Sequence, residues 1–159
     1  MRRWWLLACL AVLLGSGGAR LSAAPLVWEE DSWAEIFARR GERAFVVAFW
    51  SLECPPCYRE LDQWAALKRR LAILDLVLVS VDGPEAAEEI EAVLEERGLG
   101  WAEARVFEEG NSLRLRRAVD PAWRGELPRT YFLRGGRVVR AVSGVPDPGF
   151  VEGWLLERP

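Results

Sequence analysis

The chain has 159 residues, of which 51% are hydrophobic and 28% are charged, enough apolar material for the core of one globular domain and too much for a disordered chain. Its 21 basic and 24 acidic residues give a net charge of −3, which argues against a nucleic-acid-binding surface. The chain contains no histidine, so histidine-based acid–base catalysis, Ser-His-Asp and Cys-His nucleophiles, and histidine metal ligands are all excluded.

Residues 1–24 are predicted to be an export signal. A basic head precedes an unbroken apolar run over residues 4–14, and small residues follow it. This run is shorter than the roughly 20 apolar residues that a membrane span needs. Two alternatives stay open: residues 4–14 remain as an N-terminal membrane anchor, or Cys9 is a lipidation site. Each route delivers a single domain, residues 25–159, to the periplasm or another extracytoplasmic space, where disulfides form.

Helix and strand patterns alternate along this domain. Ser32 and Glu35 form a capping box, which predicts a helix that ends at Gly41. Residues 44–50 are a continuous apolar, β-prone run, which is typical of a strand buried on both faces. Two cysteines follow this strand directly, and a helix is predicted from them to about Arg70.

The second half of the domain continues the alternation and closes on a hairpin. The predicted elements are a strand over 74–81, a helix from about 84 to 98, a weaker strand over 103–107, a short helix to about 119, strands over 130–133 and 138–143 joined by a two-glycine turn, and a last helix over 148–157. This order predicts a three-layer α/β sandwich.

Charge is distributed unevenly along the same stretch. Residues 84–109 hold nine acidic side chains and two arginines, whereas residues 110–140 hold eight arginines and two acidic side chains. We interpret the two segments as solvated faces that attract each other, with electrostatic steering of a partner as the alternative.

Two cysteines, Cys54 and Cys57, remain once residues 1–24 are removed. A bridge between them closes too short a loop to add much stability, so a chemical role is favoured. Cys54 is expected where the helix begins, where unpaired backbone N–H groups and the helix dipole favour the thiolate. Cys57 lies one turn deeper, placed to attack a mixed disulfide. Pro55 and Pro56 are tolerated in a first helical turn and stiffen the spacing.

Three sequence features carry a resemblance to a known family. The stretch from Phe49 to Cys57, Phe-Trp-Ser-Leu-Glu-Cys-Pro-Pro-Cys, resembles the active site of thioredoxin-fold oxidoreductases, and most closely that of the exported TlpA/ResA-like group. Leu-Pro-Arg-Thr over residues 127–130 resembles the cis-proline loop of that fold, and residues 79–82 resemble the start of the group's central insertion. The resemblance implies a thioredoxin-like three-layer α/β/α sandwich with a mixed sheet, over nearly all of residues 28–157.

Catalytic roles follow from the resemblance residue by residue. Cys54 is implied to be the exposed attacking thiol and Cys57 the resolving thiol. Glu60 is implied to relay the proton that Cys57 loses, with an ordinary solvated helix glutamate as the alternative. Glu53 stands where the family usually has tryptophan, and its carboxylate is expected to raise the pKa of Cys54.

Substrate contacts are expected around the same cysteine pair. Pro128 is expected in a cis peptide bond, with the backbone of Leu127 pairing with a substrate strand. The other expected contact residues are Thr130, Trp50, Pro55 and Pro56. Trp123 either lines the site or covers the core.

The resulting hypothesis is a thiol:disulfide oxidoreductase of the cell envelope that acts as a reductant, for example in cytochrome c maturation. It implies disulfide-bearing protein substrates and a membrane-bound thiol electron donor, a monomeric protein, and no cofactor or metal beyond the Cys54–Cys57 disulfide. The alternatives are a peroxiredoxin-like thiol peroxidase, whose upstream proline is missing here, a metallochaperone, for which ligands are few, and a binding module that keeps the bridge permanently.

Overall fold

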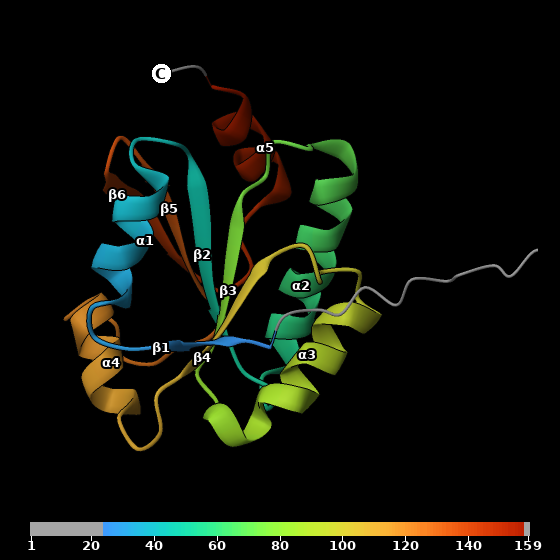
Figure 1. The fold of residues 1–159 in the computed structure, drawn as a ribbon. Helices are drawn as coiled ribbons and strands as arrows, with labels where there is room; N and C mark the ends of the chain where they lie inside the picture. Colours follow the sequence, from blue (N-terminus) through green and yellow to red (C-terminus); the bar gives the residue numbers. More distant parts are fainter. Residues whose placement is uncertain (1–23, 158–159) are drawn as a thin grey trace, which may run out of the picture.

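The computed structural model describes residues 24–157, so the predicted export signal lies outside the described residues except for Ala24. One six-stranded sheet has the order β1-β4-β3-β2-β5-β6 (Figure 1). The first four strands pair in parallel, whereas β5 runs antiparallel to both β2 and β6. In chain order the strands are β1 (Leu26–Trp28), β2 (Phe45–Trp50), β3 (Leu76–Ser80), β4 (Glu103–Phe107), β5 (Arg129–Arg134) and β6 (Arg137–Ser143).

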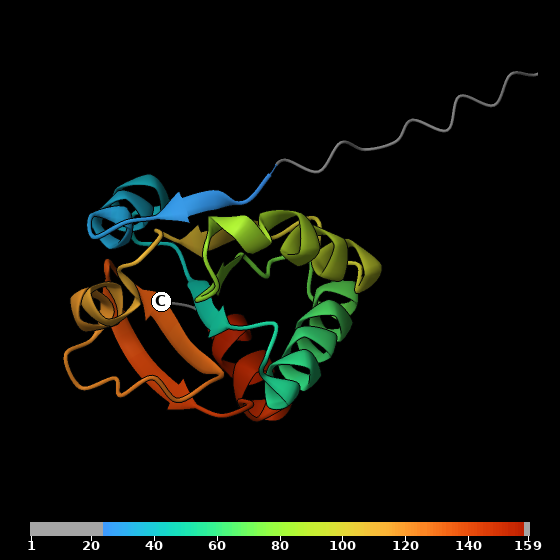
Figure 2. The ribbon, with the colours of Figure 1, turned by 90° about the horizontal axis from the view of Figure 1, so that it is seen from below.

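Helices cover both faces of this sheet (Figure 2). One face carries α1 (Ser32–Arg40) and α4 (Ser112–Val119), and the other carries α2 (Pro55–Arg70), α3 (Ala87–Glu96) and α5 (Pro148–Leu156), with a short 3₁₀ helix η1 (Pro84–Ala86) before α3. The predicted three-layer sandwich with a mixed sheet is therefore confirmed. Among residues 24–157, no helix combines the length and the apolar character needed to cross a membrane.

Strand β2 lies at the centre of the core, and all six of its residues are buried. Val46, Ala48 and Trp50 pack into the cluster beneath α2, α3 and α5. The alternate residues Phe45, Val47 and Phe49 pack into the cluster beneath α1 and α4. This two-sided burial explains the continuous apolar run in the sequence, and it directs the chain that follows Trp50 out of the middle of the sheet.

Two local predictions are wrong. Ser32 does not cap α1 in a capping box, because it is the first helical residue and its hydroxyl accepts the backbone N–H of Glu29 at 2.8 Å. Strand β1 was not predicted at all. It has three residues, of which Leu26 and Val27 are exposed, so no periodic pattern marks it. Its pairing with β4 is what makes it a strand.

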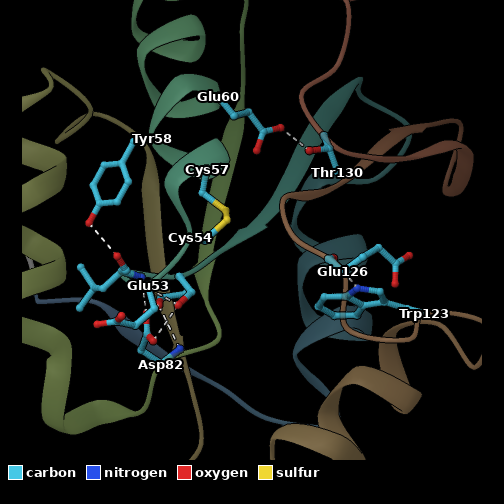
Figure 3. The surroundings of a disulfide bond; sticks show 12 residues. Glu53, Cys54, Cys57, Tyr58, Glu60, Asp82, Trp123, Glu126 and Thr130 are labelled. Carbon is cyan, nitrogen blue, oxygen red and sulfur yellow. Dashed lines mark hydrogen bonds between the residues drawn. A yellow bond between two sulfur atoms is a disulfide. The ribbon is translucent and has the colours of Figure 1, made fainter.

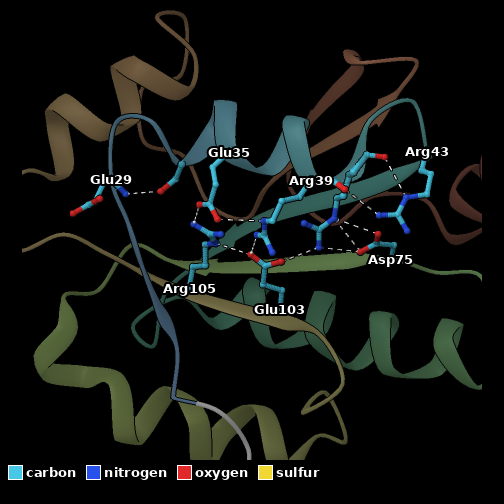
Figure 4. A network of polar contacts seen from close by, with 9 residues as sticks. Glu29, Glu35, Arg39, Arg43, Asp75, Glu103 and Arg105 are labelled. Atoms are coloured by element: carbon cyan, nitrogen blue, oxygen red, sulfur yellow. Dashed lines mark hydrogen bonds and ion pairs between the residues drawn. The ribbon is translucent and has the colours of Figure 1, made fainter.

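A network of ion pairs joins α1 to the strands beneath it (Figure 4). The buried guanidinium of Arg105 donates to Glu103 at 2.7 Å and to Glu35 at 3.0 Å. Arg40 donates to Glu103 at 3.0 Å and to Asp75 at 3.1 Å. The charges that β3 and β4 bring under α1 therefore each face an opposite charge.

Candidate redox site

The two cysteines form a disulfide where β2 ends and α2 begins (Figure 3). Their Cα atoms lie 5.3 Å apart. Cys57 is fully buried, whereas Cys54 keeps 8% of its surface. Cys54 is thus less exposed than the family resemblance implies, but it is the cysteine of the pair that solvent reaches.

The helix start around Cys54 differs from the prediction in one respect. Cys54 occupies the N-cap position of α2, so the positive end of the helix dipole points at it as expected. The unpaired N–H groups expected there are missing, because Pro55 and Pro56 fill the first two helical positions and carry no N–H. The next N–H, that of Cys57, donates to the backbone carbonyl of Cys54 at 2.9 Å. Stabilisation of a Cys54 thiolate therefore depends on the dipole.

The loop between β2 and Cys54 is held by Asp82, a residue to which the sequence analysis gave no role. The Asp82 carboxylate accepts the backbone N–H of Leu52 at 2.9 Å and the hydroxyl of Ser51 at 3.0 Å. The buried hydroxyl of Ser80 donates to the same carboxylate at 2.6 Å. Ser51 and Asp82 follow the ends of two adjacent parallel strands, which meet at one edge of the sheet, and this signal could have identified the pair from the sequence.

Glu60 is a buried carboxyl group one helical turn beyond Cys57, with only 1% of its surface exposed. The Thr130 hydroxyl donates a hydrogen bond to its Oε1 atom. Burial raises the pKa of Glu60 to about 8, and the hydrogen bond from Thr130 opposes that rise only in part. The alternative of an ordinary solvated glutamate is therefore wrong. Its raised pKa keeps the Glu60 carboxyl group mostly protonated at neutral pH.

The loop before β5 faces the disulfide from the other side. The Leu127–Pro128 peptide bond is cis, as the resemblance implies. The carbonyl of Pro128 accepts the N–H of Gly144 at 2.8 Å, whereas neither the N–H nor the C=O of Leu127 makes a hydrogen bond within residues 24–157. An extended peptide that pairs with Leu127 has a free donor and a free acceptor there.

Three of the residues expected to contact substrate are buried instead, Pro128 among them. Trp50 is 1% exposed and packs in the same cluster as Cys54 and Cys57, so it supports the disulfide from beneath. Thr130 is fully buried and its hydroxyl is engaged by Glu60. Both lie next to the site, but neither presents a surface to a partner, because β2 and β5 are central strands covered on both faces.

The remaining predicted residues lie around the disulfide at or near the surface. Glu53 and Pro55 are exposed and Pro56 is half-buried. Trp123 is 4% exposed and lies 4.9 Å, centroid to centroid, from Phe49, so it covers the core.

The Trp123 indole N–H also donates to the carbonyl of Glu126 at 2.9 Å, which ties it to the cis-proline loop (Figure 3). In the described part of the chain, no three His, Cys, Asp or Glu side chains are grouped to hold a metal ion.

No protein-family model matches the chain, and no curated protein matches its sequence. Solved structures match its fold. The thioredoxin domain of a thiol-disulfide oxidoreductase from Bacteroides vulgatus superposes with a TM-score of 0.60 at 15% identity, over 74% of this chain and 83% of that one. A thiol:disulfide interchange protein of the thioredoxin family from Chlorobium tepidum superposes with a TM-score of 0.58 at 18% identity, over 75% and 81%.

A third similar structure is a secreted Mycobacterium tuberculosis disulfide oxidoreductase, described as homologous to E. coli DsbE. It has a TM-score of 0.55 and 14% identity, and the match covers 74% of this chain and 84% of that one. At these identities the similarity establishes the fold, which is thioredoxin-like. The chemistry has to be argued from this chain's own residues.

Proposed function

We propose that the protein is a thiol:disulfide oxidoreductase of an extracytoplasmic compartment and that it reduces disulfides in other proteins. The observation that carries the proposal is the arrangement around the Cys54–Cys57 disulfide. The two sulfurs share the N-terminal turn of α2, solvent reaches Cys54 but not Cys57, and the buried carboxyl of Glu60 lies one turn further on. A structural staple needs none of these features.

The reaction begins from the reduced pair. The Cys54 thiolate attacks one sulfur of a substrate disulfide, and the other substrate sulfur leaves as a thiolate that takes a proton from solvent. The Cys57 thiolate then attacks the Cys54 sulfur and expels the second substrate sulfur. The substrate gains two electrons and two protons, and the protein is left with the Cys54–Cys57 disulfide that the structure contains. A thiol donor restores the reduced pair.

Glu60 supports the second step by accepting the proton of the buried Cys57 thiol. Positions three apart on a helix lie on the same side, so the Glu60 carboxyl and the Cys57 sulfur are neighbours. Glu60 accepts this proton from its ionised form, which is the minor form at neutral pH because its pKa is about 8. That pKa is close to the ordinary thiol value of about 8.5, so the proton transfer itself is nearly balanced. A solvated glutamate, with its much lower pKa, would be a poor acceptor.

Substrate binding is assigned to the free backbone of Leu127, with Pro55 and Pro56 as the apolar surface beside it. Leu127 is half-buried and its N–H and C=O have no partner within the described residues. A substrate strand that pairs there brings its own cysteine toward Cys54. This contact is to backbone atoms, so it accepts many substrate sequences.

Location and direction are inferred from the same features together with the sequence. The predicted export signal and the secreted Mycobacterium tuberculosis relative favour the periplasm or the outer face of the membrane. A membrane-bound thiol protein is then the natural electron donor, and exported clients such as the cysteines of apocytochrome c are suitable substrates. Because the first helical turn offers no N–H to Cys54, its thiolate is less stabilised, which favours a reductant over a strong oxidant.

The decisive test is trapping. Reduced Cys57→Ser protein, mixed with oxidised insulin, is expected to accumulate a mixed disulfide on Cys54, detected as a band that dithiothreitol removes. The Cys54→Ser protein is expected to trap at most a trace, because Cys57 is buried. A wild-type protein that reduces insulin no faster than the Cys54→Ser/Cys57→Ser variant contradicts the proposal, and rapid consumption of hydrogen peroxide would favour the peroxidase instead.

Two further measurements address the finer points. Replacing Glu60 with glutamine, with both cysteines kept, is expected to slow the attack of Cys57 on the mixed disulfide about 10²-fold, the lower end for loss of a proton acceptor. Equilibration with glutathione is expected to give a potential nearer the about −270 mV of thioredoxin than the about −120 mV of DsbA. A value close to that of DsbA would overturn the reductant assignment while leaving the exchange chemistry intact.

A further inference from the structure

A hollow of about 250 Å³ lies between α4 and the loop that leads to the cis-proline. Its lining is unusual in charge, since it combines three guanidinium groups with apolar side chains and no carboxylate. The lining residues are Leu113, Arg116, Arg117, Pro121, Trp123 and Arg124. We call Arg116, Arg117 and Arg124 the arginine patch.

The arginine patch is not neutralised by the acidic residues close to it. None of its three guanidinium groups forms an ion pair within residues 24–157, and the only side-chain hydrogen bond it makes runs from Arg116 to the carbonyl of Ser112. Arg117 and Arg124 are exposed. Like charges held together without a partner are unfavourable, so a ligand that brings negative charge is stabilised there.

The two acidic residues of this segment are engaged elsewhere. The carboxylate of Asp120 pairs with Arg129 at 2.8 Å. The carboxylate of Glu126 accepts hydrogen bonds from the backbone N–H of Arg124 at 3.1 Å and from Ser143 at 2.8 Å. Neither carboxylate therefore forms an ion pair with a guanidinium group of the patch.

The hollow shares Trp123 with the loop that carries the expected substrate-binding backbone. Trp123, which lines the hollow, donates its indole N–H to Glu126, the residue before Leu127. Leu127 lies four positions after Trp123, and an extended chain covers at most about 14 Å over that length. A substrate strand paired with Leu127 therefore needs only about four residues beyond its cysteine to reach the arginine patch.

The opposite side of the disulfide has the opposite charge. Glu53, Glu85, Glu88 and Glu89 are exposed on the loop before Cys54, on η1 and on the first turn of α3, and none forms an ion pair within the described residues. Figure 3 places Glu53 and Asp82 across the disulfide from Trp123. These glutamates do not pair with the arginines of the patch, because α3 and α4 lie on opposite faces of the sheet. Within the described residues, the expected attraction between the acidic and arginine-rich segments is realised at one ion pair, between Arg114 and Glu108 at 3.5 Å.

We propose that the arginine patch binds acidic side chains of the substrate, so that the preferred clients are polypeptides with aspartate or glutamate within about four residues of the reactive cysteine. The inference rests on the proposed function, since it names the substrate class for the same site. Arginine suits the role because its planar guanidinium binds a carboxylate through two hydrogen bonds. The pairing also fixes substrate direction, with the acidic side toward α4 and away from the glutamates of η1 and α3.

The test compares two peptides that differ only in charge. Each carries one cysteine as a mixed disulfide with a neutral thiol. On both sides of it, the third and fourth positions are glutamates in the first peptide and glutamines in the second. The reduced wild-type protein is expected to react about tenfold faster with the glutamate peptide at low salt, and the difference is expected to vanish in 0.5 M NaCl. This preference runs against the protein's own negative net charge.

The matched variants are R117E/R124E in the patch and R69E/R137E outside it. All four arginines are exposed and form no ion pair within the described residues. Arg69 lies in the last turn of α2, whereas the disulfide lies at its start, and Arg137 is the first residue of β6, after the hairpin turn (Figure 1). The patch variant is expected to lose the glutamate preference and the control variant to keep it. Equal rates for the two peptides in the wild type, or equal loss in both variants, would overturn the inference.

A binding measurement separates this inference from the proposed function. The glutamate peptide with serine in place of cysteine, carrying a fluorescent label, is titrated with oxidised protein and followed by anisotropy. The R117E/R124E variant is expected to bind at least tenfold more weakly than the wild type, and R69E/R137E equally well. If insulin reduction fails and this binding difference persists, the oxidoreductase proposal is wrong and the acidic-ligand site stands. If insulin reduction succeeds and the variants bind the peptide equally well, the acidic-ligand site is wrong and the oxidoreductase proposal stands.

Discussion

Glu60 and Glu103 are two carboxyl groups withdrawn from solvent on opposite faces of one sheet, and they show how differently a fold can treat a buried charge. Burial by itself raises the pKa of both. At Glu103 the hydrogen bonds from Arg105, Arg39 and Arg40 outweigh that effect, so its pKa ends below the ordinary value (Figure 4). Glu60 receives a hydrogen bond from the neutral Thr130 hydroxyl and no cation, and its pKa rises to about 8.

The difference between these two pKa values distinguishes a region that stabilises the fold from a region suited to chemistry. Under α1 each buried charge has an opposite charge, which holds the helix on the sheet and lowers the pKa values of Glu35 and Glu103. Beside the disulfide, Glu60 has no such partner, which costs stability but leaves a proton to exchange. Perturbed carboxyls of this kind concentrate at functional sites.

The two regions also predict opposite dependences of stability on pH. The pKa of Glu60 is about 8 in the folded state and 4.5 in the unfolded state, so the folded state binds the proton more tightly. Its contribution to the free energy of unfolding is therefore complete below about pH 4.5 and is lost as the pH rises through 8. The pKa values of Glu35 and Glu103 are lowered on folding, so their contribution is present above about pH 4.5 and is lost as the pH falls.

The largest expected effect comes from replacing Glu60 with glutamine. The oxidised wild type is expected to lose several kcal/mol of unfolding free energy between pH 5 and pH 9, with an upper bound of about 5 kcal/mol from roughly 1.4 kcal/mol per unit of pKa shift. The variant should lose almost none over that range. Urea denaturation at a series of pH values, with the disulfide intact so that no thiol titrates, measures the difference. Parallel curves for the two proteins would mean that Glu60 is ionised in the folded state.

Breaking the network at Arg105 should have the next largest effect. Replacing Arg105 with alanine leaves Glu35 and Glu103 short of a partner and is expected to lower the free energy of unfolding by about 3 kcal/mol at pH 7. It should also flatten the acid side of the pH profile. Arg114 is the matched control, because it is exposed and its pairs with Glu30 and Glu108 are expected to contribute less than about 1 kcal/mol. Equal losses for the two variants would contradict the comparison.

The comparison can also be tested at the redox site, by introducing a backbone N–H donor that the prolines of α2 lack. Replacing Pro56 with alanine introduces an N–H at the second helical position, from which helix N-termini commonly donate to the N-cap side chain. The pKa of the Cys54 thiol is expected to fall by about one unit, the value of one hydrogen bond to a charged group. The pH dependence of iodoacetamide alkylation measures it. Pro55→Ala, whose new N–H lies at the first position, should shift the pKa much less.

The smallest effect is expected at Glu53. Its exposed carboxylate precedes Cys54 and disfavours a negative charge on the sulfur, so Glu53→Ala should lower the pKa of the Cys54 thiol by roughly half a unit. The same alkylation titration applies. Glu42→Ala removes an equally exposed glutamate at the far end of the molecule, and a shift as large in that variant would assign the effect to net charge.

Much of this architecture was predictable because local patterns carried it. The buried run of β2, the helix after the cysteines and the glycine hairpin between β5 and β6 all form where the sequence predicts them. Strand β1 was not predictable, because its three residues become a strand only through pairing with β4. The roles of Trp50 and Thr130 were misjudged for a related reason. Trp50 was placed by its proximity to the cysteines in sequence and Thr130 by the cis-proline motif, and neither signal says how deeply a side chain is buried in a covered sheet.

The sequence by itself determined which reactive groups are available, namely two cysteines at the start of a helix and no histidine. It also determined the fold class, through an alternation of apolar runs that pack as a covered sheet. Tertiary structure alone decided which groups that chemistry can use. Glu60 is buried against β5, and Asp82 accepts a hydrogen bond from the loop before Cys54. The glutamates of α3 and the arginines of α4 are separated by the sheet. Each of these features involves residues that are distant in the chain. A pKa depends on the surrounding solvent and charges, and these exist only once the layers have closed.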